Sequence, residues 1–460
     1  MKDQIIHAID IGTTKIAAIA AKINQFGKIE ILGIGNSPSF GVKRGVVINI
    51  DRTVHAIQKA VEECEKQSET KFADAYVGIA GQHIKSLQHR GILTRDSLDL
   101  EISQSDIDRI IKDMSKLSLP PGDKIIHVLP QEYIVDNEQG IKEPVGMAGM
   151  RLEGNFHIVT GQISHIQNIN RSLTRAGMPE PTIVLEPLAS AAAVISAEEM
   201  EAGVCLVDIG GGTTDVAIFE DGIIRHTAVI PFGGDVITED IKQGCMILRD
   251  QAERLKVKFG SALALEAMEN EIVAIPGLRG TTHKEITVKN LSHIIMARMN
   301  EILEHVYYEL KSTGYDKKLI GGLVITGGGS QLKNLVQLAQ YVTGMDARIG
   351  FPNEHVSSSK IKEFANPMYA TGIGLIMRGF EDIEKKKARG EYVQPKQEVI
   401  HKTKEIIHRN EQLEEKKEPN KAELEDITTS KPKRSFIPDI LKNAKKWFED
   451  DFGEDFSDTK

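Results

Sequence analysis

The stretch 208–215 reads DIGGGTTD and lies between two apolar runs, and a shorter version, DIGTTK, occupies 10–15 in the same setting. Each pattern predicts a strand, a tight turn and a second strand. The predicted strands are 5–10 and 16–19 around the shorter stretch, and 204–208 and 216–219 around the longer one. The chain therefore carries the same kind of hairpin twice.

The residue types in both turns suit a bound phosphate. Glycine lets the backbone approach an anion and adopt positive φ, threonine adds a hydroxyl donor, and an aspartate at the strand end can hold a metal directly or through water. One such turn alone is an ordinary hairpin, but two in matching context predict a clamp on a Mg-nucleotide. The spacing is not that of a Walker loop, and neither turn opens a helix as a dinucleotide fingerprint does.

A third glycine cluster lies downstream of the two turns. Residues 321–326, GGLVIT, predict a buried strand, and 327–330, GGGS, interrupt it before a helix predicted over 332–342. A strand, a glycine turn and a helix N-terminus suit a phosphate or a ribose. Between the clusters, Glu253 and Lys256 lie three residues apart on one face of a predicted helix, a spacing that also fits a surface ion pair.

The order of these landmarks resembles the superfamily of actin, sugar kinases and heat-shock chaperones. Two stretches rich in small residues, 185–191 and 366–374, resemble the helices that connect the two lobes of those proteins. The resemblance implies an α/β fold of two lobes built on duplicated, ribonuclease H-like domains, with ATP and Mg²⁺ bound between them. By the same resemblance Asp10 and Asp208 would hold hydrated Mg²⁺.

The resemblance also implies roles for the other residues of the motifs. Glu186 matches the position that orients the attacking water in chaperones, and Asp215 would assist it, although a hinge or structural role fits either residue. Lys15 suits a phosphate contact or a solvated ion pair. The candidate nucleotide ligands are Asp10, Gly12, Thr13, Thr14, Lys15, Gly210, Gly211, Gly212, Thr213, Thr214, Glu253, Lys256, Gly327, Gly328, Gly329 and Ser330.

Composition agrees with a large cytosolic protein. A length of 460 residues predicts two or more domains, and 40% hydrophobic residues suffice for their cores. The net charge of −9 argues against a nucleic-acid partner. Three widely spaced cysteines suit a reducing compartment. With no signal sequence and no run of 18 apolar residues, we expect a protein that is neither exported nor membrane-spanning.

The segment 82–161 predicts a separate module within the first lobe. Its helix begins at Ser103 or Ser105 and carries an apolar face of Ile107, Ile110, Ile111 and Met114. Short strands are predicted over 124–129, 131–135 and 155–160. A module on a nucleotide-binding body favours a role in self-assembly or partner binding over a purely structural one.

The phrases VLPQEY at 128–133 and PVGMAGMRLE at 144–153 resemble those of the bacterial cell division protein family FtsA, as do the flanks 77–81 and 157–161. The resemblance covers about residues 1–380. It implies that the module is the relocated subdomain 1C, through which the family polymerises head to tail and recruits later division proteins. It also implies that the C-terminal peptide of the tubulin-like protein FtsZ docks on 233–317, where Arg298 and Glu301 are the candidate contacts or form a solvated ion pair.

The last 80 residues differ in character, since 38 of them are charged. This composition predicts a disordered linker over 385–435. Helical periodicity returns over 436–452, an amphipathic helix with basic flanks that suits an anionic membrane surface better than docking on a partner or on the body. An acidic tail follows and should weaken that attraction. The candidate membrane contacts are Phe436, Ile437, Ile440, Leu441, Trp447 and Phe448.

Together with these patterns, the FtsA resemblance implies an ATP-binding, actin-like adaptor that polymerises and tethers FtsZ filaments to the cytoplasmic face of the inner membrane at the septum, with slow or dispensable hydrolysis. The alternative is a sugar or acid kinase of the same superfold, for which the segments before Glu186 offer no obvious catalytic aspartate. The expected subdomains are 1A (1–81, 162–200 and 365–384), 1C (82–161), 2A (201–232 and 318–364) and 2B (233–317). The segment 267–285 shows no regular pattern.

Overall fold

A computed structural model describes residues 4–72, 74–95, 101–178, 181–266, 271–277, 283–352, 356–357 and 365–390. The described residues end at 390, so they include neither 391–435 of the predicted linker nor any of the predicted membrane helix, 436–452.

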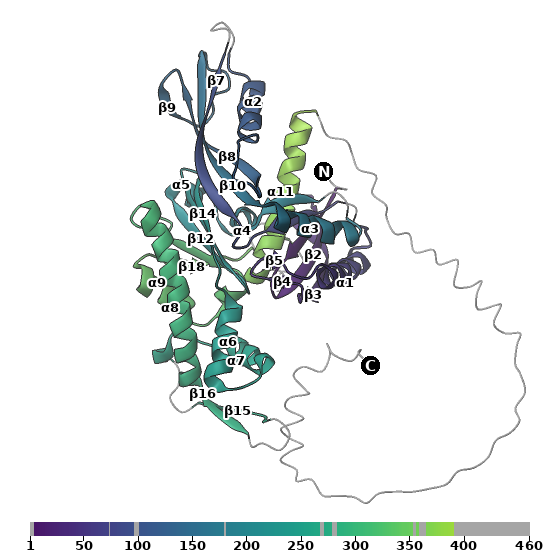
Figure 1. The fold of residues 1–460 in the computed structure, drawn as a ribbon, viewed down its shortest axis with the longest axis vertical. Coiled ribbons are helices and arrows are strands. Elements are labelled where there is room, and N and C mark those ends of the chain that lie inside the picture. The colour runs from purple at the N-terminus through teal and green to yellow at the C-terminus, as the bar shows by residue number, and fades with distance from the viewer. Residues whose placement is uncertain are drawn as a thin grey trace, which may run out of the picture. The chain divides into compact units, whose positions relative to one another are not determined.

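Two five-stranded sheets of the same connectivity carry the two glycine turns (Figure 1). In each, three consecutive strands run antiparallel, and the first of the three also pairs in parallel with a later strand. Lobe 1 has the order β11-β6-β1-β2-β3 and lobe 2 the order β14-β13-β12-β17-β18. The shared order confirms the predicted duplication.

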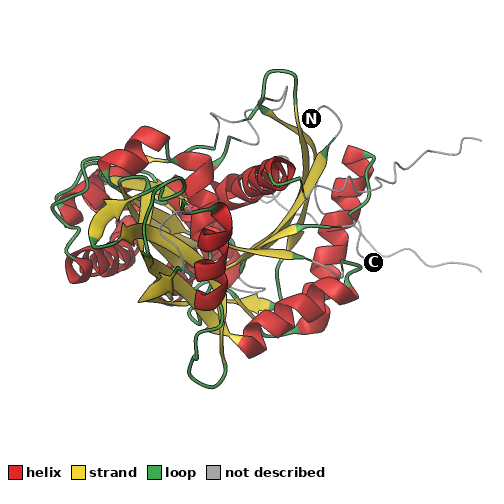
Figure 2. Cartoon of the chain, turned by 90° about the horizontal axis from the view of Figure 1, so that it is seen from above, coloured by secondary structure: helices red, strands yellow, loops and turns green. Residues whose placement is uncertain are grey.

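The lobe 1 strands are β1 (Ile5–Ile11), β2 (Lys15–Ile23), β3 (Ile29–Pro38), β6 (Tyr76–Ile79) and β11 (Thr182–Leu185). The lobe 2 strands are β12 (Val204–Ile209), β13 (Thr214–Glu220), β14 (Ile223–Ile230), β17 (Leu323–Thr326) and β18 (Ala347–Ile349). The hairpins β1-β2 and β12-β13 confirm the strands predicted around both turns. Their side chains are buried on both faces because helices flank the sheets (Figure 2).

Lobe 1 is completed by helices and a small hairpin. The helices are α1 (Ile50–Ser68), α3 (Ile163–Arg175), α4 (Glu186–Val194), α5 (Ala197–Ala202), the short η3 (Pro367–Tyr369) and α11 (Ala370–Ala388), and the hairpin is β4 (Val42–Lys43) with β5 (Val46–Val47). The helices α4 and α11 confirm the predicted connectors. They cross closely, since a Cβ on Gly374 would lie 1.8 Å from the carbonyl oxygen of Ala189. The helix α11 reaches Ala388, so the first four residues assigned to the linker are helical.

Lobe 2 carries a second group of elements, which includes four α-helices. They are α6 (Gly234–Cys245), α7 (Arg249–Phe259), α8 (Val288–Thr313) and α9 (Leu335–Thr343), with the short helices η1 (Ala264–Glu266) and η2 (Gly328–Gln331) and the strands β15 (Ile272–Ile275) and β16 (Lys284–Thr287). Two expectations were wrong here. The helix predicted from 332 begins at Leu335, because the glycines first form a 3-10 turn. The segment 267–285, which showed no pattern, contains β15 and the first two residues of its partner strand β16.

The inserted module is a four-stranded sheet, β7-β10-β8-β9, with one helix against it (Figure 1). Its elements are β7 (Lys85–Thr94), α2 (Gln104–Met114), β8 (Asp123–Val135), β9 (Glu138–Ile141) and β10 (Arg151–Gln162). Ser103 caps α2, and three of the four predicted apolar residues on that helix are buried in a core separate from those of the lobes.

The two strands predicted over 124–135 are one continuous strand. Proline usually interrupts a strand because it cannot donate a ladder hydrogen bond. Here Pro130 pairs with Phe156 and Glu132 with Asn155, so Gln131 is the extra residue of a β-bulge. The bulge lets the strand continue past the proline. Strands β7 and β9 were not predicted.

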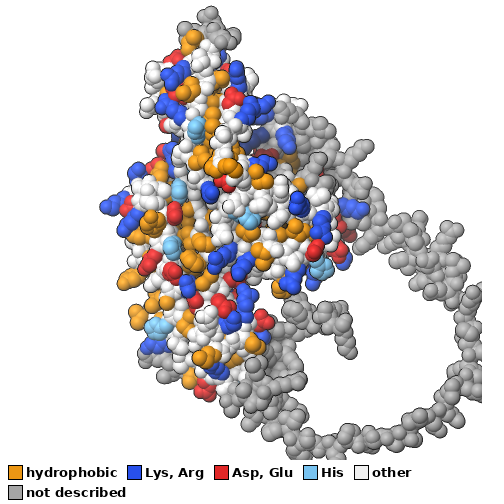
Figure 3. Space-filling view, viewed as in Figure 1, with side chains coloured by type: hydrophobic (Ala, Val, Ile, Leu, Met, Phe, Trp, Pro, Cys, Tyr) orange, Lys and Arg blue, Asp and Glu red, His pale blue; other side chains and the backbone are white. Residues whose placement is uncertain are grey.

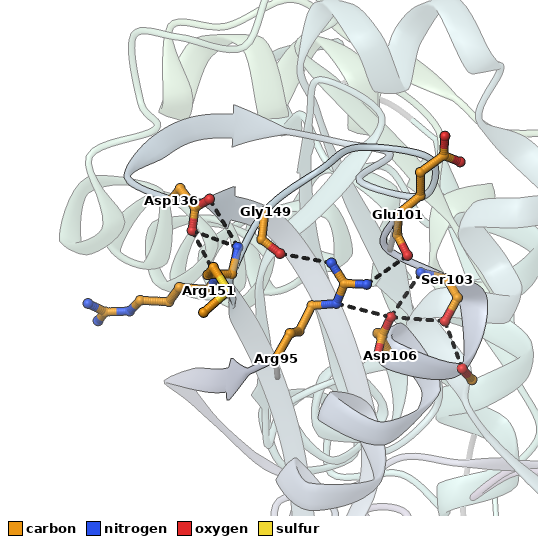
Figure 4. A network of polar contacts seen from close by, with 9 residues as sticks. Arg95, Glu101, Ser103, Asp106, Asp136, Gly149 and Arg151 are labelled. Carbon is orange, nitrogen blue, oxygen red and sulfur yellow. Dashed lines mark hydrogen bonds and ion pairs between the residues drawn. The ribbon is translucent and has the colours of Figure 1, made fainter. Parts of the chain in front are cut away.

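A buried arginine organises the far end of the insert (Figure 4). The guanidinium of Arg95 donates to the carbonyl oxygens of Gly149 at 2.8 Å and Glu101 at 2.7 Å. Its Nε lies 3.5 Å from the carboxylate of Asp106, which in turn accepts from Ser103 at the start of α2. This network joins two loops to the helix.

Within the described residues, every helix is too short or too polar to span a bilayer.

Candidate functional site

A cavity of about 610 Å³ lies where the two glycine turns meet. This volume is in the range of small-molecule and cofactor sites. The predicted site residues that line it are Asp10, Gly12, Thr13, Thr14, Lys15, Glu186, Asp208, Gly210, Gly211, Gly212, Thr213, Asp215, Glu253, Lys256, Gly327, Gly328 and Gly329. Residues from both sheets, α4, α7 and η2 thus converge on one space.

The two turns touch each other through their glycines. A Cβ on Gly211 would lie 2.0 Å from the hydroxyl oxygen of Thr14, and one on Gly212 would lie 2.5 Å from that of Thr13. A side chain at either position would push the turns apart. The glycines of the second turn therefore serve the approach of the lobes as well as that of a ligand.

The cavity is lined by the buried carboxyl groups of Asp10, Asp208 and Asp215 and by the partly buried one of Glu186. Burial, followed by the charge of Asp208, raises the pKa of Asp215 to about 8, and burial raises the pKa of Asp10 to about 6 against the opposing effect of Lys15. Burial raises the pKa of Glu186 well above its usual value, and that of Asp208 is raised for the same reason. Burial and the charges of neighbouring carboxylates disfavour ionisation of these acids, and a bound cation would offset the repulsion between them.

Lys15 is one of the cations that line the cavity. Burial lowers the pKa of its ammonium group to about 8, although Asp10 acts in the opposite direction. Its Nζ lies 3.7 Å from the centroid of the Tyr369 ring and has no hydrogen-bond partner. The Oδ1 atom of Asp215 is also buried and unpartnered. Unsatisfied buried polar atoms are rare, and two at one cavity indicate that a ligand belongs there.

The carboxylate of Asp208 is held by two hydroxyl groups that sequence reasoning did not single out. Ser190 of α4 donates to its Oδ2 at 2.6 Å, and Thr371 of α11 donates to the same oxygen at 3.3 Å. Both residues lie in the small-residue stretches 185–191 and 366–374. The signal was present in those stretches, but which hydroxyl faces the site depends on how the helices cross.

Glu253 and Lys256 form an ion pair and also line the cavity, so the two interpretations of this pair are compatible. The Nζ of Lys256 lies 2.8 Å from the Glu253 carboxylate, and it donates to the carbonyl oxygen of Gly234 and to the hydroxyl of Thr238, each at 2.8 Å. The side chain of Lys256 is only 11% exposed. It therefore joins α7 to the start of α6.

Two predicted ligands do not line the cavity. The hydroxyl of Thr214 donates to the carbonyl oxygen of Phe232 at 2.9 Å, and that of Ser330 donates to the carbonyl oxygen of Gly327 at 2.7 Å. Both hydroxyls are used to hold the glycine turns in shape. Their side chains thus stabilise the backbone of the site without lining the cavity.

Several lining residues were missed, among them Gly45, Asp235, Gln331 and Met368. Gly45 belongs to the turn between β4 and β5, and its amide donates to the Thr13 hydroxyl at 3.2 Å. A Cβ on Gly45 would lie 2.7 Å from the Cα of Gly81, where the insert begins. No local pattern around Gly45 indicated that this hairpin would close the cavity.

The predicted partner contacts Arg298 and Glu301 lie on α8, away from the cavity. Arg298 pairs with Glu301 and also with Asp240 of α6, through Nε to Oδ2 at 2.6 Å and Nη2 to Oδ1 at 3.1 Å. The side chain of Arg298 is 23% exposed. The pair is therefore part of a network between two helices rather than an isolated solvated pair.

The carboxyl groups of the cavity are the candidate ligands of a metal ion. Among the described residues, no three His, Cys, Asp or Glu side chains are grouped so that they could hold a metal ion. Asp10 and Asp208 are the carboxylates at the ends of β1 and β12, with Asp208 near the glycine turn that follows β17. A hydrated Mg²⁺ fits such a pair, since this ion usually keeps several waters and takes further ligands from phosphate.

Two family models match this chain, one over most of lobe 2 and one over the insert. The model described as "Cell division protein FtsA" matches residues 205–374, and that of the "SHS2 domain inserted in FTSA" matches 81–160. A protein named "Cell division protein FtsA" from Pseudomonas aeruginosa is 39% identical over 378 residues, which cover 82% of this chain and 90% of that protein. This chain belongs to the FtsA family of cell division proteins.

Other relatives support the FtsA assignment. The proteins of the same name from Neisseria meningitidis and Escherichia coli strain K12 are 39% and 31% identical, over 82% of this chain and 90% and 91% of their own lengths. The FtsA resemblance of the sequence is thus confirmed, and with it the actin-like fold and the inserted domain.

Solved structures share the fold at low sequence identity. The "PilM-PilN type IV pilus biogenesis complex" matches with a TM-score of 0.61 and 14% identity, over 81% of this chain and 98% of that one. MreB5 of Spiroplasma citri bound to ADP matches with a TM-score of 0.52 and 14% identity, over 84% and 99%. These neighbours establish the two-lobed architecture around the FtsA site.

Proposed function

We propose that this FtsA-family chain binds ATP with Mg²⁺ in the cavity between the turns. The observation that carries the proposal is the pairing of two equivalent glycine turns with four carboxyl groups, three of them buried, and with a lysine whose buried Nζ lacks a hydrogen-bond partner. The glycine turns, Thr13, Thr14, Lys15 and Thr213 would hold the phosphates. Glu253, Lys256 and the turn 327–330 would frame the nucleoside, and the ion would supply charge neutralisation near Asp10 and Asp208.

Hydrolysis, where it occurs, would use the carboxyl groups nearest the phosphate turns. Glu186 begins α4 and, with Asp215 of β13, would orient a water molecule, provided that a bound cation offsets the burial that raises the pKa of both carboxyl groups. The nucleotide would act mainly as a conformational ligand that biases assembly.

Nucleotide binding is tested directly with the full chain and a fluorescent ATP analogue, methylanthraniloyl-ATP, titrated with and without Mg²⁺. We expect binding that requires Mg²⁺ and is competed by unlabelled ATP. Binding that is equally strong in EDTA would contradict the metal assignment. No binding at all would remove the nucleotide from the proposal.

We further propose that the chain polymerises and tethers FtsZ filaments to the cytoplasmic face of the inner membrane at the septum, with later division proteins recruited through the insert. The family assignment supports this role, and the subdomain ranges 1A, 1C, 2A and 2B belong to the same proposal. Heterologous contacts that repeat head to tail would build the polymer. On the face shown in Figure 3, basic and acidic side chains are interspersed over the described residues, which suits protein partners better than nucleic acid.

The membrane part is tested by co-sedimentation with phosphatidylglycerol-containing vesicles in Mg-ATP. The full chain is compared with a chain truncated after Ser430 and with the double substitution Trp447→Glu and Ile440→Glu. We expect only the unmodified full chain to pellet with lipid, because one amphipathic helix binds through its apolar face. Equal pelleting of all three would place the membrane contact elsewhere. Failure of all three to pellet would assign the helix to a partner.

The FtsZ contact is tested by fluorescence anisotropy with a labelled FtsZ C-terminal peptide. Arg298→Ala is expected to weaken binding about tenfold, because it removes a charged hydrogen-bond donor from the α6-α8 surface. The matched control is Arg378→Ala, which removes the arginine of another i, i+3 arginine–glutamate pair, on α11. Equal effects of both substitutions would contradict a contact at Arg298.

A further inference from the structure

The insert contacts both lobes, in each case at a strand next to an element that carries an acid of the cavity. On the lobe 1 side, the contact comes from His127 of β8. Its Nε2 accepts a hydrogen bond from the backbone amide of Leu185 at 3.0 Å. Leu185 is the last residue of β11 and directly precedes Glu186. The insert therefore holds the backbone from which that carboxyl group projects.

On the lobe 2 side, the insert lies against β14, the edge strand of the sheet. His157 of β10 is hydrogen-bonded through Nε2 to the hydroxyl of Thr227 at 3.1 Å, and both side chains are buried. Gln131, the bulged residue of β8, donates to the carbonyl oxygen of Ile224 at 3.0 Å. Ser86 of β7 donates to the carbonyl oxygen of Thr227 at 3.2 Å. Three strands of the insert thus bind one strand of lobe 2.

Strand β14 is in turn paired with the strand that leaves the second glycine turn. Its last residues, Val229 and Ile230, pair with Asp215 and Thr214 of β13. The hydroxyl of Thr214 also donates to the carbonyl oxygen of Phe232, just after β14. A displacement of β14 would therefore displace the turn that lines the cavity.

The two histidines make these contacts in the neutral form. Since His127 accepts through Nε2, that nitrogen carries no proton, and the ring is neutral. Burial lowers the pKa of His127 and of His157 to about 4, with smaller effects from Arg378 and His226 respectively. At neutral pH both rings therefore act as fixed hydrogen-bonding groups.

We propose that the insert is a coupling element that bridges the two lobes across the cavity, so that nucleotide occupancy and the position of the insert control each other. The insert is covalently part of lobe 1, and its polar contacts fasten it to β14 of lobe 2. Any change in the angle between the lobes must strain or break those contacts. Coupling of this kind is reciprocal, so a protein bound to the insert changes nucleotide affinity by the same factor. The inference rests on the proposed nucleotide binding.

The test uses the full chain and the double substitution Gln131→Leu and Thr227→Val. Each replacement is close to isosteric. Gln131→Leu removes the hydrogen bonds to the carbonyl oxygens of Ile224 and Arg225, and Thr227→Val removes the one to His157. The matched control is Gln139→Leu, a glutamine on exposed strand β9 of the same insert. Ser86→Ala, which removes a single contact, serves as a milder variant if the double substitution lowers the yield of folded protein. Hydrogen exchange is followed by mass spectrometry with and without Mg-ATP.

We expect Mg-ATP to slow exchange in 123–135 and 151–162 of the wild type and of Gln139→Leu, and to leave the double variant unchanged there. The Kd for methylanthraniloyl-ATP should rise on the order of fivefold in the double variant, since the two turns are no longer held in place. The same nucleotide-dependent protection and the same Kd in the double variant would overturn the coupling.

A separate readout distinguishes failure of the coupling from failure of nucleotide binding. Without nucleotide, the double variant should exchange faster than Gln139→Leu in 204–220, which the insert holds through the pairing of β14 with β13. If the wild type binds no nucleotide but this difference appears, the bridge stands and the nucleotide proposal falls. If the wild type binds nucleotide and no difference appears in either readout, the bridge falls.

Discussion

The first and second glycine turns have the same backbone design and opposite chemistry. Both lie between antiparallel strands, with Asp10 and Asp208 at the end of the incoming strand. The first turn is followed by Lys15, a buried cation, and the second by Asp215, a buried acid. Each of these two side chains has a buried polar atom without a hydrogen-bond partner.

The difference shows how a duplicated fold acquires an asymmetric site. The sheets contribute the same two turns, but the first turn brings the positive charge and the second brings the glycines that allow close approach. Neither turn alone forms the cavity. The following predictions test this division of roles.

The largest effect is expected from Gly211→Ala, because its Cβ would lie 2.0 Å from the Thr14 hydroxyl oxygen. Overpacking of this kind should lower the free energy of unfolding by about 3 kcal/mol. Adding Thr14→Ala removes that oxygen and should recover part of the loss. Urea unfolding of the two single variants and the double variant gives the coupling energy. Strictly additive losses would show that the turns do not press on each other.

Lys15→Met is expected to weaken methylanthraniloyl-ATP binding by about thirtyfold, or about 2 kcal/mol, because it removes a buried charged donor. The control is Lys22→Met on the same strand, where the lysine forms a partly exposed pair with Glu30. A Kd unaffected by Lys15→Met would mean that the cation serves the folded structure alone.

Asp215→Asn should change how stability depends on pH. The pKa of Asp215 in the folded protein, about 8, lies above its unfolded value, so the folded state holds the proton more tightly. This contribution to stability is present at low pH and is lost as the pH rises through about 8. In EDTA without nucleotide, the variant should therefore gain on the order of 1 kcal/mol over the wild type between pH 6 and pH 8.

Urea unfolding at several pH values measures this difference. The buried histidines, whose pKa values are lowered from 6.5 to about 4, act with the opposite sign below about pH 7, but they contribute equally to variant and wild type and cancel in the difference. A constant difference between variant and wild type across the window would show that Asp215 is ionised in the folded protein.

The smallest effect concerns the matching threonines. Thr13 accepts a hydrogen bond from the Gly45 amide, whereas Thr213 donates to Asp215 at 3.3 Å. Thr13→Val leaves a backbone amide unsatisfied and should cost about 1 kcal/mol of unfolding free energy. Thr213→Val should cost less, because the carboxyl it contacts is able to take up a proton. Paired urea titrations decide the order, and a larger loss for Thr213→Val would reverse it.

Local patterns were enough for the strands and glycine turns, since apolar periodicity and positive φ requirements are short-range properties. The motifs at 10–15, 208–215 and 327–330 all converge on one cavity, as predicted. The continuous strand β8 was missed because a proline is read locally as a break, whereas the bulge that accommodates it depends on the facing strand β10. The pairing of β15 with β16 was missed for a similar reason, because each strand is only four residues long.

The amino-acid sequence was sufficient to indicate the duplication, the family resemblance and most of the residues around the cavity, because glycine turns and their flanking strands are coded within a few neighbouring positions. Three-dimensional packing was needed to show that Ser190 and Thr371 hold Asp208 and that Gly45 lines the cavity. It was also needed to show that His127 of the insert contacts lobe 1, whereas Gln131 and His157 contact lobe 2. Those contacts join residues separated by up to 181 positions, as between Ser190 and Thr371, and their partners exist only once the sheets and helices have assembled.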